Sequence, residues 1–295
     1  MRPHRGSSHN NATNPARQSA GSHLVVPPGP APAPDGTIVD ISPASAGWGH
    51  VGFEVLALGD GQRARREAGD RECCVVVVQG RAHVRSEHGE WRDLGGRADP
   101  WAGAPDAAYL PPGTTFTVEA VTDDTEVALC WAPATADAAA PARVLPGAEI
   151  EVEVRGHGAQ ERHVRPILMG GQEAASLLVV EVLTPGGHWS SYPPHKHDRD
   201  ALPEESLLEE TYYHRVSPRQ GFALQRVYTA EGDLDETMTV RDRDTVLVPR
   251  GYHTVSAPPG YDLYYLNVMA GPVREWVFAN DPDHEWTLQP RAASG

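Results

Sequence analysis

The segment SSYPPHKHDRDALPEESLLEETYYH, residues 190–214, gathers the residue types that hold a divalent metal ion. His195 and His197 flank Lys196 in a His-x-His pattern. Because alternate side chains of an extended chain share a face, both imidazoles can point at one ion while Lys196 points away from it. The pattern therefore predicts a strand that carries two metal ligands.

Further donors follow along the chain. Glu209 and Glu210 stand where a strand is expected to begin, and His253 lies in the turn sequence VLVPRGYHTV. Imidazoles combined with one carboxylate suit Zn, Mn, Fe, Co or Ni better than Ca or Mg. We predict a site for one divalent metal ion, most simply Zn, and the spacing alone leaves open which of the two glutamates binds it.

The composition restricts the class of protein. A net charge of −15 without a compensating basic block argues against nucleic acid or an anionic membrane as a partner. Cys73, Cys74 and Cys130 are odd in number and fit a reducing compartment. There is no run of about 18 apolar residues, and no apolar segment follows Arg2 and Arg5 as in a secretory signal. We expect a soluble cytoplasmic protein.

The chain divides into an arm and two halves. Residues 1–35 are rich in Ser, Asn, Gly, Ala and Pro and are predicted to be a disordered arm. Short Val-rich runs bounded by Gly, Pro and Asp then predict an all-β protein. We place one antiparallel, jelly-roll-like β-barrel at 36–140 and a second at 141–295, with residues 134–148 as the linker.

The two halves resemble each other, which indicates an internal duplication. Glu72 aligns with Glu210, and the turn at 109–116 aligns with the turn at 247–254. Thr115 then stands in place of the histidine, and no His-x-His precedes Glu72. The metal site is therefore predicted in the second half only.

Long stretches of the second half resemble one isomerase family of the cupin superfamily almost word for word. This family comprises the 5-deoxy-glucuronate isomerases of inositol catabolism and the uronate isomerases of pectin breakdown. The resemblance covers residues 51–286 and implies a bicupin. It is carried by PPHKHD (193–198), LPEESLLEETYYHR (202–215), GFALQRVYT (221–229), LDETMTVRDRDTVLVPRGYH (234–253), YYLNVMAG (264–271) and NDPDHEW (280–286).

Two departures from the general cupin pattern also match this family. A long insert separates His197 from the glutamates, and a single residue separates Gly251 from His253. In the family the ligand glutamate directly precedes a hydrophobic or β-branched residue, here Thr211, so the resemblance implies Glu210. The implied metal ligands are therefore His195, His197, Glu210 and His253.

The resemblance implies an aldose–ketose isomerisation, from 5-deoxy-D-glucuronate to 5-dehydro-2-deoxy-D-gluconate. A divalent ion would stabilise the enediolate while an acid or base moves a proton between adjacent carbons. Tyr212, His214 and Lys196 are the candidates for the proton transfer, with Lys196 expected to point away. No GxGxxG or P-loop motif suggests a nucleotide cofactor.

A sugar-acid substrate also requires a cation. Arg226, in the strand GFALQRVYT, is the preferred partner for its carboxylate, although a surface ion pair is an equal alternative for this residue. The weaker candidates are Arg165, Arg250 and Tyr265.

Two other functions fit the same fold. Three histidines and one glutamate around iron also serve metal-dependent dioxygenases among cupins, and a non-catalytic sugar-acid-binding cupin would need no turnover. Exposed strand edges make a homo-oligomer plausible.

Overall fold

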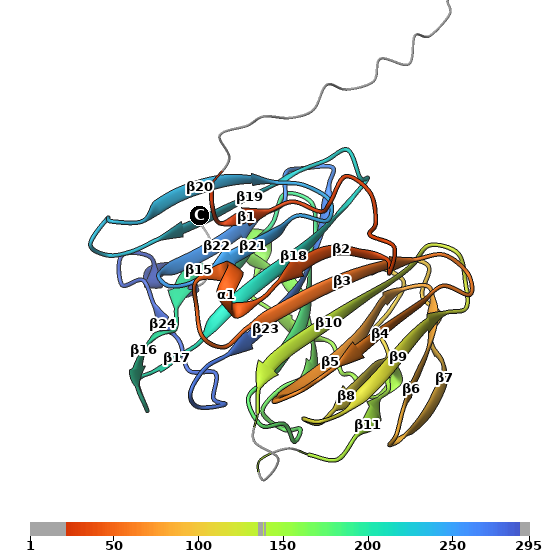
Figure 1. Cartoon of the computed structure of the whole chain (residues 1–295). Coiled ribbons are helices and arrows are strands. Elements are labelled where there is room, and N and C mark those ends of the chain that lie inside the picture. Colours follow the sequence, from red (N-terminus) through yellow and green to blue (C-terminus); the bar gives the residue numbers. More distant parts are fainter. Residues whose placement is uncertain (1–21, 135–137, 139, 290–295) are drawn as a thin grey trace, which may run out of the picture.

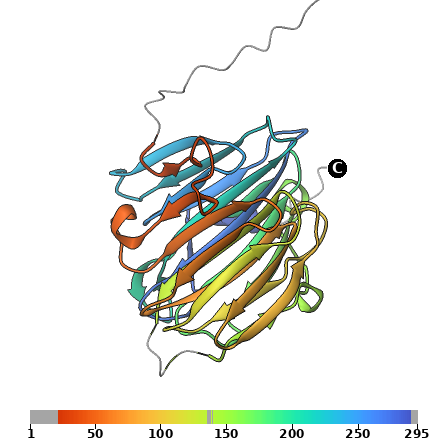
Figure 2. The same ribbon diagram turned by 45° about the vertical axis from the view of Figure 1, so that its right-hand side comes forward.

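The structure, a computed structural model, describes residues 22–134, 138 and 140–289. Two β-barrels lie side by side, and each is formed by a larger and a smaller antiparallel sheet (Figures 1 and 2). In the first barrel the larger sheet has the order β11-β8-β5-β10-β3-β2 and the smaller sheet β4-β9-β6-β7. Its strands are β2 (Thr37–Ile41), β3 (Gly52–Leu58), β4 (Arg63–Glu67), β5 (Arg71–Gln79), β6 (Arg81–Ser86), β7 (Gly89–Gly95), β8 (Ala107–Leu110), β9 (Thr115–Ala120), β10 (Thr125–Pro133) and β11 (Arg143–Leu145).

The second barrel repeats this topology. Its larger sheet has the order β1-β21-β18-β23-β14-β13-β12 and its smaller sheet β20-β19-β22-β15-β24. A short pair, β16 (Asp198–Ala201) and β17 (Glu205–Leu207), lies in the insert after His197. The other strands are β1 (Val25–Val26), β12 (Glu153–Arg155), β13 (Arg162–Leu168), β14 (Leu178–Thr184), β15 (Trp189–Lys196), β18 (Glu209–Ser217), β19 (Ala223–Tyr228), β20 (Asp235–Val240), β21 (Thr245–Val248), β22 (Tyr252–Ser256), β23 (Asp262–Ala270) and β24 (Ala279–Asn280).

Helices contribute little to the described residues. They are α1 (Pro43–Ala46) and the 3₁₀ turns η1 (Gly147–Glu149), η2 (Gly158–Gln160) and η3 (Glu285–Leu288). Over the part of the chain that the structure describes, no helix has the length and apolar character needed to span a membrane.

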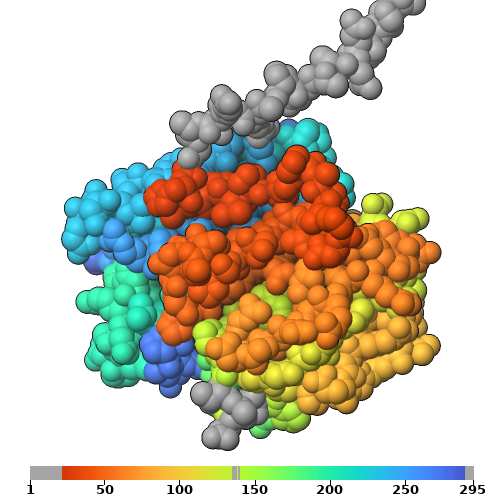
Figure 3. All heavy atoms as spheres, in the orientation of Figure 1, coloured from red at the N-terminus to blue at the C-terminus, as the bar shows by residue number. Residues whose placement is uncertain are grey.

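Each half gives one strand to the other barrel. β1 precedes the first barrel but pairs with β21 of the second, and β11 precedes the second barrel but pairs with β8 of the first. Figure 3 shows the N-terminal segment, in red, lying against the blue second barrel. Residues 143–145 thus belong to the first sheet, although the sequence analysis began the second domain at 141.

The prediction of a disordered arm is wrong for residues 22–35. Leu24 is buried, and Val25 pairs with Val246 at the edge of the sheet. Adding a strand to an exposed edge satisfies backbone groups, and burying Leu24 offsets the entropy of ordering. Residues 1–21, the rest of that predicted arm, lie outside the described residues.

The larger sheets of the two barrels pack against each other and form a continuous core that includes residues of both halves. This packing explains the apolar run of β5. Cys74 and Val76 face the second barrel, whereas Cys73 and Val75 face the interior of the first. A strand that is buried on both faces has no polar alternation to show.

The ladders confirm the duplication but shift its register. Cys73 of β5 pairs with Leu110, which precedes Pro111, and Glu210 of β18 pairs with Val248, which precedes Pro249. Cys73 is therefore equivalent to Glu210, and Glu72 to Glu209. The alignment of Glu72 with Glu210 is therefore wrong by one residue. In a strand, one residue of shift moves a side chain to the opposite face.

Glu72 and Glu209 form what we call the reciprocal clasps between the barrels. Glu72 accepts hydrogen bonds from the backbone N–H groups of residues 175–177, before β14, at 2.6–2.8 Å. Glu209 accepts from the N–H groups of residues 49–51, before β3, at 2.6–2.9 Å. Each half thus needs a loop of the other half to satisfy a carboxylate.

Candidate metal centre and active site

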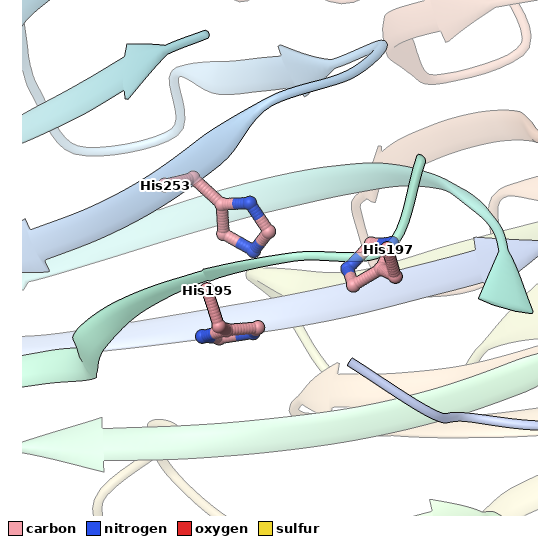
Figure 4. A group of neighbouring side chains, drawn as sticks. All are labelled: His195, His197 and His253. Carbon is pink, nitrogen blue, oxygen red and sulfur yellow. The ribbon is translucent and has the colours of Figure 1, made fainter. Parts of the chain in front are cut away.

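Three histidines converge inside the second barrel. His195 on β15 pairs directly with His253 on β22, and His197 follows β15 by one residue. One ring nitrogen of each lies within 4.8 Å of the others, and all three side chains are buried. The rings point toward a common centre (Figure 4). Among the described residues, these three histidines are the group of side chains placed closely enough to hold a metal ion.

Glu210 lies against this cluster. Its Oε2 is 3.1 Å from His197 Nε2 and 3.2 Å from His253 Nε2. Burial raises the pKa of Glu210, but hydrogen bonds with His197 and His253 lower it to about 2, so the carboxylate is ionised. Glu209 lies on the opposite face of β18, in its clasp, as the alternation of strand side chains requires.

Hydrogen bonds orient two of the imidazoles. His197 Nδ1 lies 3.0 Å from the carbonyl oxygen of Leu208, and His253 Nδ1 lies 3.2 Å from that of Gly251. A carbonyl only accepts, so each Nδ1 carries the proton and each Nε2 faces the centre. Burial, followed by the neighbouring imidazoles, holds the pKa of His195 well below its usual value, which keeps its ring neutral.

A polar network outside the barrel holds the ligand segments together. Lys196 points away from the imidazoles, as predicted, and pairs with Asp198 at 2.5 Å and Glu205 at 2.8 Å. Asp198 Oδ2 also accepts the backbone N–H of Gly251 at 2.7 Å. Gly251 has a φ of +89°, and a Cβ there would lie 2.5 Å from the carbonyl oxygen of Tyr228. The turn before His253 thus requires glycine.

A cavity of about 270 Å³ opens beside the cluster. Its apolar lining includes valines, Met269 and the aromatic rings of Trp276 and Phe278. Its polar lining includes Arg155, Arg162, Ser191, His195, Glu210, Tyr212, Tyr265, Asn267 and Asn280. A small polar molecule in this cavity therefore reaches His195 and Glu210 directly.

Tyr212 lines this cavity and His214 lies behind it. The Tyr212 hydroxyl is 2.9 Å from Ser191 Oγ, and burial followed by the charge of Glu210 raises the Tyr212 pKa well above its usual value. His214 stacks on Tyr212 and contacts Gln225 at 2.8 Å through Nε2. Burial lowers the pKa of His214 to about 4. His214 is not part of the cavity lining.

The structure does not bring Arg226 to the cavity. Gln225 faces the barrel interior, so Arg226 points outward, where it pairs with Asp235 at 2.8 and 2.9 Å. The preference for Arg226 as the carboxylate partner is therefore wrong, and the surface ion pair is what the structure shows. Of the weaker candidates, Arg165 contacts Glu181 between the barrels, Arg250 pairs with Asp233 outside, and Tyr265 lines the cavity beside Ser190.

Arg155 and Arg162, the two arginines that line the cavity, were not among the site residues predicted from the sequence. They are opposite each other in the pairing of β12 with β13. Both precede the quoted motifs, and their side chains reach the cavity only because β13 joins the larger sheet through β14. No local pattern marks them.

Two tandem barrels of one topology, with a buried imidazole cluster in the second, define the chain as a bicupin. Solved structures of low identity support this fold. The oxalate decarboxylase of Lactobacillus farciminis, in a formate complex, has a TM-score of 0.60 at 14% identity and covers 89% of both chains.

Closer relatives define the family. The KduI/IolB family model matches residues 24–287, and the chain belongs to that family. A 5-deoxy-glucuronate isomerase of Geobacillus kaustophilus is 52% identical over 274 residues, which is 92% of this chain and 98% of that protein. One of Listeria monocytogenes serotype 4a is 48% identical over 260 residues, 87% of this chain and 94% of that one. An IolB-like protein of Salmonella typhimurium LT2 superposes with a TM-score of 0.86 at 44% identity, covering 90% of this chain and 99% of that one. The chain is an isomerase.

Proposed function

We propose that the chain is a metal-dependent aldose–ketose isomerase that converts 5-deoxy-D-glucuronate to 5-dehydro-2-deoxy-D-gluconate in inositol catabolism. The observation that carries this proposal is the buried cluster of three histidines and Glu210 at a small polar cavity. The names of the curated relatives support the choice of substrate.

The residues fit a divalent metal ion. Two imidazoles present Nε2 to the centre with their Nδ1 hydrogens held by carbonyl groups, an arrangement usual for histidine ligands. Burial lowers the pKa of His197, but the hydrogen bond and charge of Glu210 outweigh it and raise the pKa above its usual value, and metal binding would release that proton. Nitrogen ligands with one carboxylate suit Zn, and Mn, Fe, Co and Ni are the alternatives. We propose His195, His197, Glu210 and His253 as the ligands.

A bound divalent ion would polarise the carbonyl and stabilise the negative charge of the enediolate. Proton transfers complete the reaction: a base takes the proton from the carbon next to the carbonyl and returns it to the former carbonyl carbon, and an acid protonates the oxygen atom that becomes negative. With its raised pKa, the Tyr212 phenol stays protonated and can donate to an oxygen atom that becomes negative. Ser191 fixes the direction of that hydroxyl. We propose Tyr212 as the catalytic acid, with His214 acting through Tyr212 as a positioning residue.

The test is direct. Purified protein is incubated with 5-deoxy-D-glucuronate under anaerobic conditions, the ketose is followed by NMR, and bound metal is measured on the same sample. We expect ketose formation without oxygen, and loss of both metal and turnover in His195→Ala with a retained β-sheet circular dichroism spectrum. Turnover that requires oxygen would instead indicate a dioxygenase, and binding without turnover would indicate a sugar-acid-binding protein. Activity in metal-free His195→Ala would refute the metal site.

A further inference from the structure

The two cavity arginines differ in how their charges are satisfied. Arg155 donates twice to Glu153 Oε2, at 2.9 and 2.6 Å. Arg162 donates to the backbone carbonyl of Gln160 at 3.1 Å. Among the described residues, no carboxylate lies within ion-pairing distance of Arg162. Most of its five N–H donors are thus free to bind something else.

Three other buried or half-buried arginines of this fold have their guanidinium groups satisfied by protein groups. Arg97 contacts Glu181, and Arg215 contacts Glu126, both through buried carboxylates. Arg274 donates instead to four backbone carbonyl groups. A guanidinium that is partly buried with one neutral partner is costly unless an anion joins it.

Arg162 lines the same cavity as His195 and Glu210, two of the proposed metal ligands. Tyr212 and Tyr265 line this cavity as well. Burial is the main cause of the lowered pKa of Arg162. A cation and a metal-binding cluster thus share one small cavity.

We propose that Arg162 binds the carboxylate of the sugar acid and makes the enzyme selective for uronates over neutral aldoses. This inference rests on the proposed function for the identity of the substrate, but not for the existence of the anion site. The fork of the guanidinium matches a carboxylate with two parallel hydrogen bonds. A molecule held by Arg162 occupies the same cavity as His195 and Glu210.

The probe is 5-deoxy-D-glucuronate reduced at its aldehyde with borohydride, which keeps the carboxylate and hydroxyls but cannot isomerise. Its carboxamide is the neutral counterpart. Binding of both to metal-loaded protein is measured by calorimetry. We expect Arg162→Gln to weaken binding of the acid about 10- to 100-fold, as loss of a charge-assisted pair does, and to leave binding of the amide unchanged. Arg162→Lys, which keeps the charge without the fork, should fall between.

Arg226→Gln is the matched control, because Arg226 lies outside the cavity and pairs with Asp235. It should bind both probes like the unmodified protein. Bound metal, measured in each variant, must stay constant. Equal affinity of the unmodified protein for acid and amide, or equal losses in Arg162→Gln and Arg226→Gln, would overturn the inference. Selective binding of the acid without turnover of 5-deoxy-D-glucuronate would support Arg162 and refute the proposed function instead.

Discussion

Adjacent glutamates on β18 should respond in opposite ways to the same isosteric change. Glu210→Gln removes the anionic group of the imidazole cluster, whereas Glu209→Gln removes the negative charge from the clasp on residues 49–51. The substitutions conserve volume and lie one residue apart. A difference in stability or metal affinity between the two variants therefore shows which glutamate faces the imidazole cluster and which faces the clasp.

The magnitudes follow from the contacts. A hydrogen bond to a charged acceptor contributes about 1 kcal/mol more than one to a neutral acceptor. Glu209 accepts three such bonds. Since the N–H of Gly49 is exposed and can bind water, we expect Glu209→Gln to lower the free energy of unfolding by about 2 kcal/mol. Loss of a hydrogen bond that orients a metal ligand weakens metal binding about 10- to 100-fold, so loss of a ligand itself in Glu210→Gln should weaken it at least about 100-fold.

Two assays separate these effects. Urea unfolding in the presence of a chelator measures stability without metal, and competition with a chromophoric chelator measures metal affinity. Glu209→Gln should be destabilised with normal metal affinity, and Glu210→Gln should lose metal affinity. If Glu209→Gln loses the metal and Glu210→Gln keeps it, the assignment of faces on β18 is refuted.

Three further substitutions test other parts of the structure. Asp198→Asn weakens the link to the Gly251 N–H and should lower metal affinity about tenfold in the same competition assay; unchanged affinity would exclude this support. Burial lowers the pKa of His214 from 6.5 to about 4, so between these pH values the folded protein binds fewer protons than the unfolded chain. The stability that neutral His214 contributes is therefore fully present above pH 6.5 and is lost as the pH falls toward 4. Between pH 8 and 5, His214→Gln should lose about 2 kcal/mol less stability than the unmodified protein in chelator-containing urea; identical losses would contradict the burial argument. Glu72→Gln should cost about 2 kcal/mol with normal metal content, and a loss of metal would show that the first barrel acts on the centre.

The all-β fold was predictable because its strands are short apolar runs between turn residues. Because these runs are apolar throughout, they do not show the register in which the strands pair. Val75 and Val76 lie on opposite faces of β5, yet both are buried, so no polar alternation shows which face meets the second barrel. The match of Glu72 to Glu210 followed identical letters, whereas the pairing of β5 with β8 and of β18 with β21 makes Glu72 equivalent to Glu209.

The clustering of the candidate site was predictable where the proposed ligands are close in sequence and alternate along one extended segment, as His195 and His197 do. Alternation alone separates His195 and His197 from Lys196. Alternation did not give the correct orientation of Arg226. Which face of β19 points into the barrel becomes clear only from the contact of Gln225 with the buried His214. Arg162 lies at the cavity because β13 pairs with β14, and β14 pairs with the distant β23. The sequence around Arg162 carries no sign of these pairings.

The exchange of β1 and β11 between the barrels has the form of a domain-swapped dimer that has been joined into one polypeptide. After such a fusion, only one copy must retain the chemistry, while both must retain the surface by which they hold each other. The first barrel follows this division: Cys73 occupies the position of Glu210, but Glu72 keeps the clasp of Glu209. Because Glu209 of the second barrel takes its three N–H donors from residues 49–51, we expect a deletion of the first barrel to destabilise the second.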